Sequence, residues 1–412
     1  MRAAMERPGL VLSAVKEGRG SDKAEHRALA ADLLHQAQAA LDAQPPDALT
    51  VGGFIDNDDI ALSLVLSRIA EKQAATPSPA RPGVMREEIA GTDRFELLDP
   101  GWWASVANRL VHAKVPFILH SSLNDFRVEL PDEKLSIALI GDWGTGLDSS
   151  REIARHMAAR NPALTIHLGD VYYSGTKQEV ETRFLPDWPS GTKGTFAINS
   201  NHEMYAGGEG YFRVTLPNPV FARNQKASYF CVSTPGWQII GLDSAYAASD
   251  FLFQKGKLSD KQIAWLEAQL AEGARRGQRS IVLSHHNPIA VRGGTDQSFL
   301  DQMFGAAADH PFEFWYFAHE HVAARYASFG PAGRQFLGRC VGHGGVPYAP
   351  EKIGDAGNGI QVQWTETELA NDPEEPRRAK NGFVFLVLDS AAKTLEETFI
   401  DELGKEKTSG SF

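Results

Sequence analysis

The sequence predicts a mixed α/β fold, and three features between residues 134 and 402 lead to this prediction. Short apolar segments alternate with helical patterns, as they do in α/β sheets. Further short apolar segments crowd the last part of the chain, which indicates a β-rich second half. Polar, chemically capable side chains follow several of the expected strands directly, which is where α/β folds place their ligands.

Residues 1–130 have a different character and are expected to form a helical accessory region. Helical spacing of apolar residues runs through 21–44, 58–75 and 100–111, and Pro45-Pro46 ends the first of these segments. A proline-rich stretch at 76–83 is typical of a linker. We expect a main α/β domain at 131–405 and a flexible tail at 406–412, with the accessory region as a candidate surface for homo-oligomer formation.

The main α/β domain is expected to open with a buried strand at 135–140. Ser149-x-x-Glu152 has the pattern of a capping box and predicts a helix that ends near Arg160. The next apolar segments predict strands at 164–168, 195–198, 229–232 and 237–242. Ser259-x-x-Gln262 then predicts the cap of an amphipathic helix.

The remaining strands are predicted at 281–283, 314–317, 322–328, 334–341, 383–388 and 395–400. Between them, residues 366–381 are charged and contain prolines, which favours an exposed loop. No apolar stretch approaches the ~18 residues of a membrane span.

Charge and cysteine content narrow the functional class. The net charge of -11 argues against a broad nucleic-acid interface. The two cysteines, Cys231 and Cys340, cannot form a disulfide framework, so we expect buried, reduced thiols. The N-terminal residues lack a convincing signal peptide, and we expect a cytoplasmic protein.

Five predicted strands end in residues that can bind metals or move protons. Because ligands bind outside the carboxyl ends of strands in open α/β sheets, we expect these residues to converge. They are Asp142, Asp170 with Tyr173, Asn201 with His202, His285, and His319 with His321. The spacings of 28 residues from Asp142 to Asp170 and 31 from Asp170 to Asn201 each fit one βαβ unit.

Carboxylate, phenol, amide and imidazole groups are oxygen and nitrogen donors, which favours Mn, Fe or Zn over a Zn-thiolate site. The set is too large for one ion that keeps a position open for water, so it indicates two ions that share a carboxylate. Two such ions can clamp the attacking and leaving oxygens of a displacement at phosphorus. Taken singly, each motif fits a turn, a helix cap or a packing residue, and only their joint order favours catalysis.

The order of these motifs resembles the calcineurin-like metallophosphoesterase superfamily, and within it the purple acid phosphatase branch. The motifs are Gly141-Asp142-Trp143-Gly144, Gly169-Asp170-Val171-Tyr172-Tyr173, Ser200-Asn201-His202-Glu203, Val282-Leu283-Ser284-His285 and Ala318-His319-Glu320-His321. Gly144 stands where most of the superfamily has histidine, and Tyr173 follows Asp170 by three residues, which marks that branch. Ser200 and Ala318 depart from the glycines usual in the family.

The resemblance implies a four-layer αββα sandwich with two metal ions at its edge, iron paired with iron, zinc or manganese. One ion would be bound by Asp142, Asp170, Tyr173 and His321. The other would be bound by Asp170, Asn201, His285 and His319, so that Asp170 bridges the pair.

The implied activity is hydrolysis of a phosphate monoester by a metal-bound hydroxide, with His202 facing the leaving oxygen as a proton donor. Glu203, His286 and His343 are weaker candidates for supporting or substrate-contacting roles, and each also fits a purely structural one. A phosphodiesterase acting on cyclic nucleotides or phospholipid headgroups is the alternative, because His285-His286 is similar to the paired histidines of cyclic-nucleotide members. A metal-bearing, non-catalytic binding module is a further alternative, against which the intact His202 argues.

Overall fold

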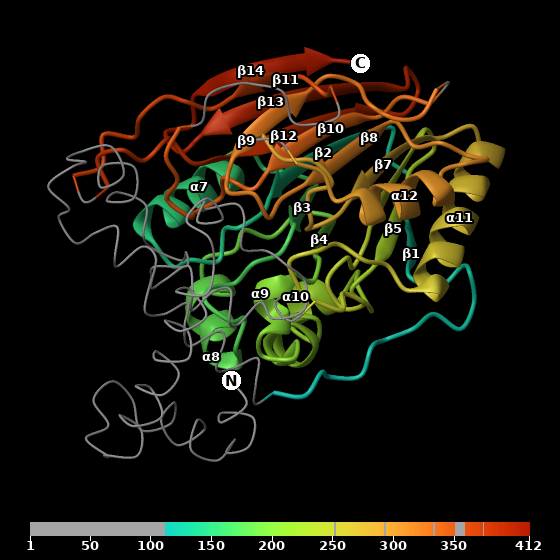
Figure 1. The fold of residues 1–412 in the computed structure, drawn as a ribbon, viewed down its shortest axis with the longest axis horizontal. Helices are drawn as coiled ribbons and strands as arrows, with labels where there is room; N and C mark the ends of the chain where they lie inside the picture. The colour runs from blue at the N-terminus through green and yellow to red at the C-terminus, as the bar shows by residue number, and fades with distance from the viewer. Residues whose placement is uncertain (1–111, 251–252, 292–293, 333, 351–358, 374) are drawn as a thin grey trace, which may run out of the picture.

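The computed structural model describes residues 112–250, 253–291, 294–332, 334–350, 359–373 and 375–412 (Figure 1). The helical segments and the linker that the sequence predicts before residue 112 lie outside the described residues. Within the described residues, no helix is both long and apolar enough to cross a membrane.

One sheet has six strands in the order β14-β13-β12-β2-β3-β4. Its strands are β2 (Lys134–Ile140), β3 (Leu164–His167), β4 (Gly194–Ala197), β12 (Gly382–Asp389), β13 (Thr394–Asp401) and β14 (Glu406–Ser411). β2, β3 and β4 run parallel, while β12, β13 and β14 add an antiparallel extension at the β2 side. The residues that follow β2, β3 and β4 therefore emerge at one edge of the sheet.

The other sheet has eight strands in the order β1-β5-β6-β7-β8-β10-β9-β11. Its strands are β1 (Arg127–Glu129), β5 (Phe230–Ser233), β6 (Trp237–Gly241), β7 (Arg279–Leu283), β8 (Phe314–Phe317), β9 (Ala323–Tyr326), β10 (Leu337–Val341) and β11 (Val362–Thr365). The central strands β6, β7, β8 and β10 are parallel. β5 and β6, both predicted from the sequence, pair antiparallel.

The two sheets pack face to face, and strand periodicity explains how. Successive side chains of a strand point to opposite faces. Accordingly Ile239 and Phe314 join an inter-sheet core with Ile137 and Leu139 of the six-stranded sheet. The alternate side chains, such as Ile240, belong to a second core on the outer face of the eight-stranded sheet.

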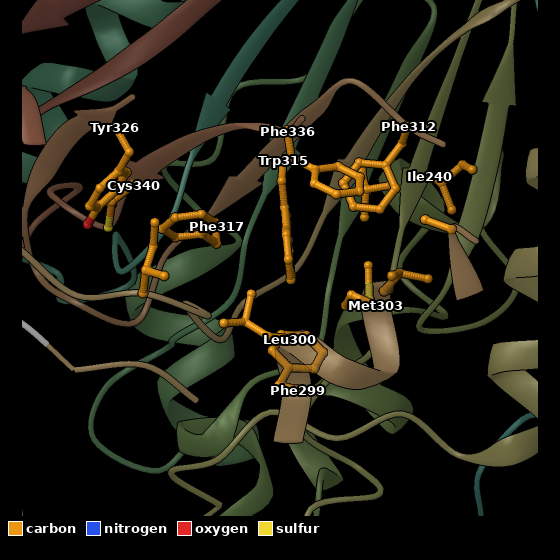
Figure 2. Packing of buried hydrophobic residues seen from close by; sticks show 14 of the residues in the cluster. Ile240, Phe299, Leu300, Met303, Phe312, Trp315, Phe317, Tyr326, Phe336 and Cys340 are labelled. Carbon is orange, nitrogen blue, oxygen red and sulfur yellow. The ribbon is translucent and has the colours of Figure 1, made fainter. Parts of the chain in front are cut away.

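Helices cover the two outer faces and complete four layers. α11 (Asp260–Arg275) and α12 (Gln297–Ala306) pack on the eight-stranded sheet, where Trp315 and Phe317 meet Phe299, Leu300 and Met303 (Figure 2). α7 (Asp148–Ala159) packs on the six-stranded sheet through Ile153, Ala154 and Met157. The structure thus shows the αββα sandwich that the resemblance implies.

Short helical turns lie between the strands near the edge that carries the motifs. They are α8 (Lys177–Glu179), α9 (Asn201–Met204), α10 (Pro219–Ala222) and the π-helical turns η2 (Val180–Phe184) and η3 (Tyr211–Thr215). α9 begins at Asn201, shortly after β4 ends at Ala197, and carries two of the predicted site residues. Its position therefore decides where those two side chains point.

The segment before β2, predicted as part of the accessory region, lies against the two-sheet sandwich. The amide of Val115 donates to Gly207 O at 2.8 Å, and the Tyr246 hydroxyl donates to Val115 O at 2.7 Å. Phe117 stacks on Tyr246 with ring centroids 4.4 Å apart. β1 then pairs with β5, so residues 115–129 are integrated into the sandwich.

Two local predictions were wrong. α7 begins at Asp148 after Leu147, which makes no side-chain cap, so Ser149 lies inside the helix rather than at its cap. The predicted flexible tail at 406–412 contains β14, which pairs with β13 from Glu396 to Ile400. The edge of β13 offers unpaired backbone groups, and β14 satisfies them. In contrast, the predicted cap of α11 is confirmed, because the Ser259 side chain accepts from the Gln262 amide.

Candidate metal centre

The predicted site residues lie where the carboxyl ends of strands from both sheets meet. β2, β3 and β4 of the six-stranded sheet lead to Asp142, Asp170 and Asn201. β7 and β8 of the eight-stranded sheet lead to His285 and His319. The centre is thus assembled across the junction of two sheets rather than along the edge of one.

The turns after the strands have an unusual backbone conformation at three of these residues. The φ angles are 56° at Asp142, 76° at Asp170 and 69° at His319. Positive φ is uncommon outside glycine, and Asp and His are among the residues that tolerate it best. These turns direct the side chains toward the junction instead of along the strand axis.

Close approach of the sheets at the junction depends on Gly141. Its amide donates to Val341 O at 3.0 Å, which links β2 to β10 of the other sheet. A Cβ added at residue 141 would lie 2.4 Å from the Cβ of Ala318. Ala318 is therefore accommodated because residue 141 has no side chain.

Among the described residues, Asp142, Asp170 and His285 form the group whose ligand atoms lie within 4.8 Å of one another. All three side chains are buried. His285 Nδ1 lies 2.8 Å from Leu168 O, which can only accept, so Nδ1 carries the proton. Nε2 is therefore an unprotonated acceptor, and it lies 3.3 Å from Asp170 Oδ1.

Asn201 presents a second acceptor to the same nitrogen. Its Nδ2 donates to the Tyr205 hydroxyl at 3.0 Å, which turns Oδ1 toward His285 Nε2 at 2.7 Å. Neither of these two acceptors carries a proton, so their lone pairs repel each other. A cation bound between them would remove this repulsion. The donor set thus fits a metal ion on the evidence of its own geometry.

His319 and His321 complete the ring of donors. His319 Nδ1 lies 3.2 Å from His285 Nε2, and the His319 amide donates to Asp142 Oδ2 at 3.0 Å. His321 Nε2 lies 3.5 Å from Asp142 Oδ1. One histidine therefore lies on the His285 side of the centre and the other on the Asp142 side.

The tyrosine whose hydroxyl enters this group is Tyr172. It lies 2.8 Å from Asp170 Oδ2, 3.1 Å from Asp142 Oδ1 and 3.1 Å from His321 Nε2. The Tyr173 amide donates to Glu179, and the Tyr173 ring lies 5.5 Å from the Arg183 guanidinium. The resemblance implies Tyr173 as the phenolic ligand, whereas in the structure the hydroxyl nearest these side chains is that of Tyr172.

His202 lies beside the centre and is held by its other nitrogen. Its Nδ1 donates to Tyr173 O at 2.6 Å, and its Nε2 lies 3.7 Å from Asp170 Oδ2. The ring centroid is 4.4 Å from that of Tyr172. The imidazole therefore presents Nε2 next to the predicted bridging carboxylate.

Glu203 is buried behind Asp170 and orders its loop. Its carboxylate accepts from the amides of Asp170 at 3.3 Å and Val171 at 3.0 Å. The Ser200 hydroxyl bonds to both Glu203 and Asp170 Oδ1, and it accepts from the Asp170 amide at 3.1 Å. Sequence reasoning noted Ser200 only as a departure from glycine, whereas here its hydroxyl holds Asp170.

The other weak candidates differ in position, because the His286 ring lies 4.9 Å from that of His319 at the centre. His286 Nε2 donates to Phe253 O at 2.6 Å, and its Nδ1 accepts from the Ser244 hydroxyl at 2.8 Å. The His343 ring packs 6.2 Å from that of Phe399 in β13. These contacts anchor the two histidines within the fold.

Burial and mutual charge set the protonation of the centre. Burial, followed by the charge of Asp170, raises the pKa of Asp142 well above its usual value. Burial opposes ionisation of Asp170, but His202 and His285 outweigh it and hold its pKa well below the usual value. Burial lowers the pKa of His285 to about 3 and lowers that of His319 also. Neutral imidazoles keep the lone pairs that metal binding requires.

Comparison with known proteins identifies the family of this region. Residues 135–323 match the family described as calcineurin-like phosphoesterase, which confirms the superfamily that the motifs indicate. No curated protein sequence gives a significant match to the chain.

Solved structures give weak likenesses. GAP50, the anchor in the inner membrane complex of Plasmodium, is 11% identical with a TM-score of 0.49, covering 67% of this chain and 88% of its own. The purple acid phosphatase PPD1 from yellow lupin is 13% identical with a TM-score of 0.49, and the match covers 68% of this chain and 54% of the lupin chain. A dimetal phosphatase from Danio rerio is 12% identical with a TM-score of 0.45, and the match covers 67% of this chain and 98% of the Danio rerio chain.

Proposed function

We propose that this calcineurin-like phosphoesterase is a purple acid phosphatase-like enzyme that uses two metal ions to hydrolyse phosphate monoesters. The observation that carries the proposal is the convergence of buried acceptors. His285 Nε2, Asn201 Oδ1 and Asp170 Oδ1 face one another with no proton between His285 and Asn201. Such a cluster costs stability unless a cation binds it.

The geometry supports two overlapping sets of ligands. Asp170, Asn201, His285 and His319 surround one position, and Asp142, Asp170 and His321 surround the other with a phenol. Asp170 contacts members of both sets and is the proposed bridge. Bound cations would acidify water and neutralise the charge of a phosphoryl group, and iron, zinc and manganese all suit these ligands.

His202 is the proposed proton donor to the leaving oxygen. The bond from its Nδ1 to Tyr173 O fixes the ring, so that Nε2 faces the centre. Burial lowers the pKa of His202, and the Asp170 carboxylate only partly opposes the change, so a proton placed on Nε2 is given up more readily than from a free imidazolium. A histidine fixed in this way can hold a proton at Nε2 and deliver it to an oxygen that leaves phosphorus.

The remaining chain features fit a small substrate. The net charge of -11 supports a small phosphate ester rather than a nucleic acid. The thiols of Cys231 and Cys340 are free and buried, which supports a cytoplasmic location. A phosphodiesterase stays the alternative in the same class, although His286, which suggested it, is bonded to Phe253 and Ser244.

Turnover of a matched pair of aryl phosphates tests the proposal. Purified protein would be loaded with Mn, Fe or Zn, and 4-nitrophenyl phosphate compared with bis(4-nitrophenyl) phosphate by kcat/KM. We expect a preference of at least about tenfold for the monoester. A preference of that size for the diester would favour the phosphodiesterase. A metal-loaded protein inactive on both would favour the binding module.

A variant of Asp170, the proposed bridging ligand, tests whether activity depends on the bound metals. Asp170→Asn should lose bound metal and turnover together, because the bridging carboxylate belongs to both ligand sets. Asp187→Asn is a matched control, since Asp187 pairs with Arg151 on α7. Full metal content and turnover in Asp170→Asn would contradict the proposed bridge.

A further inference from the structure

Two adjacent residues, Tyr172 and Tyr173, are candidates for the phenol of the centre, and the structure gives them different environments. Tyr172 is fully buried, whereas Tyr173 is partly exposed. The Tyr172 hydroxyl lies within 3.1 Å of atoms from Asp142, Asp170 and His321. These three residues and a phenol together form the ligand set of one metal position.

The backbone of Tyr172 is fixed on both sides. Its amide donates to Gly144 O at 3.0 Å, and its carbonyl accepts from Arg183 at 2.7 Å. Gly144 and Val171 form a parallel bridge just before it. The side chain of residue 172 is therefore directed into the centre by bonds that do not depend on a metal.

Gly144 makes this arrangement possible. A Cβ added at residue 144 would lie 2.8 Å from both Asp170 O and Val171 Cα. Any side chain there would push the Asp170–Tyr172 segment away. The glycine thus allows the segment to approach close enough for the Tyr172 hydroxyl to reach Asp142.

Tyr173 makes different contacts through its main chain and its ring. Its amide donates to Glu179, the N3 residue of the capping box of α8, and its carbonyl accepts from His202 Nδ1. Its ring lies beside the Arg183 guanidinium at 5.5 Å. The main chain of Tyr173 orients His202, and its side chain lies with Arg183.

We propose that Tyr172, one residue earlier than the motif spacing indicates, is the phenolic metal ligand of this centre. The inference rests on the proposed two-metal centre and assigns one ligand within it. Asp142, Asp170 and His321 would share that metal position with the Tyr172 oxygen.

Colour tests the assignment without any turnover. A phenolate bound to ferric iron gives a visible charge-transfer band, and a phenylalanine at that position cannot. The wild type, Tyr172→Phe and Tyr173→Phe would each be loaded with ferric iron, with iron content measured by mass spectrometry and folding by circular dichroism. We expect the band in the wild type and in Tyr173→Phe, and its loss in Tyr172→Phe.

Three outcomes would overturn the assignment. They are loss of the band in Tyr173→Phe, retention of the band in Tyr172→Phe, and a wild type that binds two irons without colour. If Tyr172→Phe fails to fold or to bind iron, Tyr173→Phe still decides, because its band persists only when another tyrosine is the ligand. Failure of the proposed activity would appear separately, as a coloured protein that hydrolyses no phosphate ester.

Discussion

Asp170 and Ser200 are joined by two hydrogen bonds, one through the main chain and one through the side chain. The Asp170 amide donates to Ser200 Oγ at 3.1 Å, and the Ser200 hydroxyl bonds to Asp170 Oδ1. Asp170 has a φ of 76°, a conformation that non-glycine residues adopt at a cost. The pair of bonds holds this conformation and points the carboxylate into the centre.

Ser200→Ala should weaken metal binding by roughly 10- to 100-fold, because groups that orient ligands have effects of that size. Titration of metal-free protein with Zn measures the affinity. Ser390→Ala is a matched control: this buried serine bonds to Thr234 and adjoins Glu133 at the other end of β2. Equal affinities in Ser200→Ala and the wild type would show that the hydroxyl does not orient Asp170.

His202→Ala should retain metal and lose roughly 10²- to 10⁴-fold in kcat, the range typical of a removed general acid. Metal content and kcat for 4-nitrophenyl phosphate check this. His156→Ala on α7 serves as the histidine control, since His156 pairs with Glu152 on the helix surface. A His202→Ala enzyme as active as the wild type would remove this residue from the mechanism.

His167 should make the protein less stable in acid. Burial lowers the pKa of His167 to about 3. The unfolded chain binds a proton below about pH 6.5, while the folded chain does not until about pH 3, so stability falls as pH falls between these values. The ring lies 4.7 Å from Phe184 and 5.1 Å from Trp188, so phenylalanine suits the site.

Urea denaturation of metal-free His167→Phe and wild type at several pH values tests this effect. Between pH 6.5 and pH 4, the wild type should lose more unfolding free energy than the variant, by an amount on the order of a few kcal/mol. Parallel pH dependences of the two proteins would mean that His167 is protonated in the folded state as readily as in the unfolded chain.

Glu397 and Arg339 tie the two sheets together through a buried ion pair. Arg339 Nε lies 2.9 Å from both Glu397 oxygens, and the Tyr316 hydroxyl donates to Glu397 at 2.7 Å. Glu397→Gln leaves the Arg339 charge buried without its partner, which costs about 3–5 kcal/mol of stability. Glu152→Gln on the surface of α7 should have little effect on thermal unfolding. A small effect of Glu397→Gln would show that Arg339 finds another partner or water.

Much of the fold follows from local sequence pattern. The β8 strand was predicted at its observed bounds, and most other strands within a few residues, because buried strands are short apolar runs bounded by polar turns. β14 was missed because its sequence, Glu406 to Ser411, is polar and small. Its strand conformation comes from pairing with β13, which no local pattern reveals.

The site was predictable to the level of the motif but not of the individual contact. Asp142, Asp170, Asn201 and His285 follow strands, and their convergence follows from parallel topology. The proposed assignment of Tyr172 over Tyr173 could not follow from spacing, because it rests on how Gly144 lets the Asp170 loop approach. The distribution of the ligands over two sheets likewise depends on tertiary packing.

The most direct test of the two-metal account is the rate of 4-nitrophenyl phosphate hydrolysis as metal-free protein is titrated with Mn. The account predicts that the rate rises until about two metal equivalents per chain are bound and then stays constant. A rate that reaches its plateau at one equivalent, or no hydrolysis with two ions bound, would contradict it.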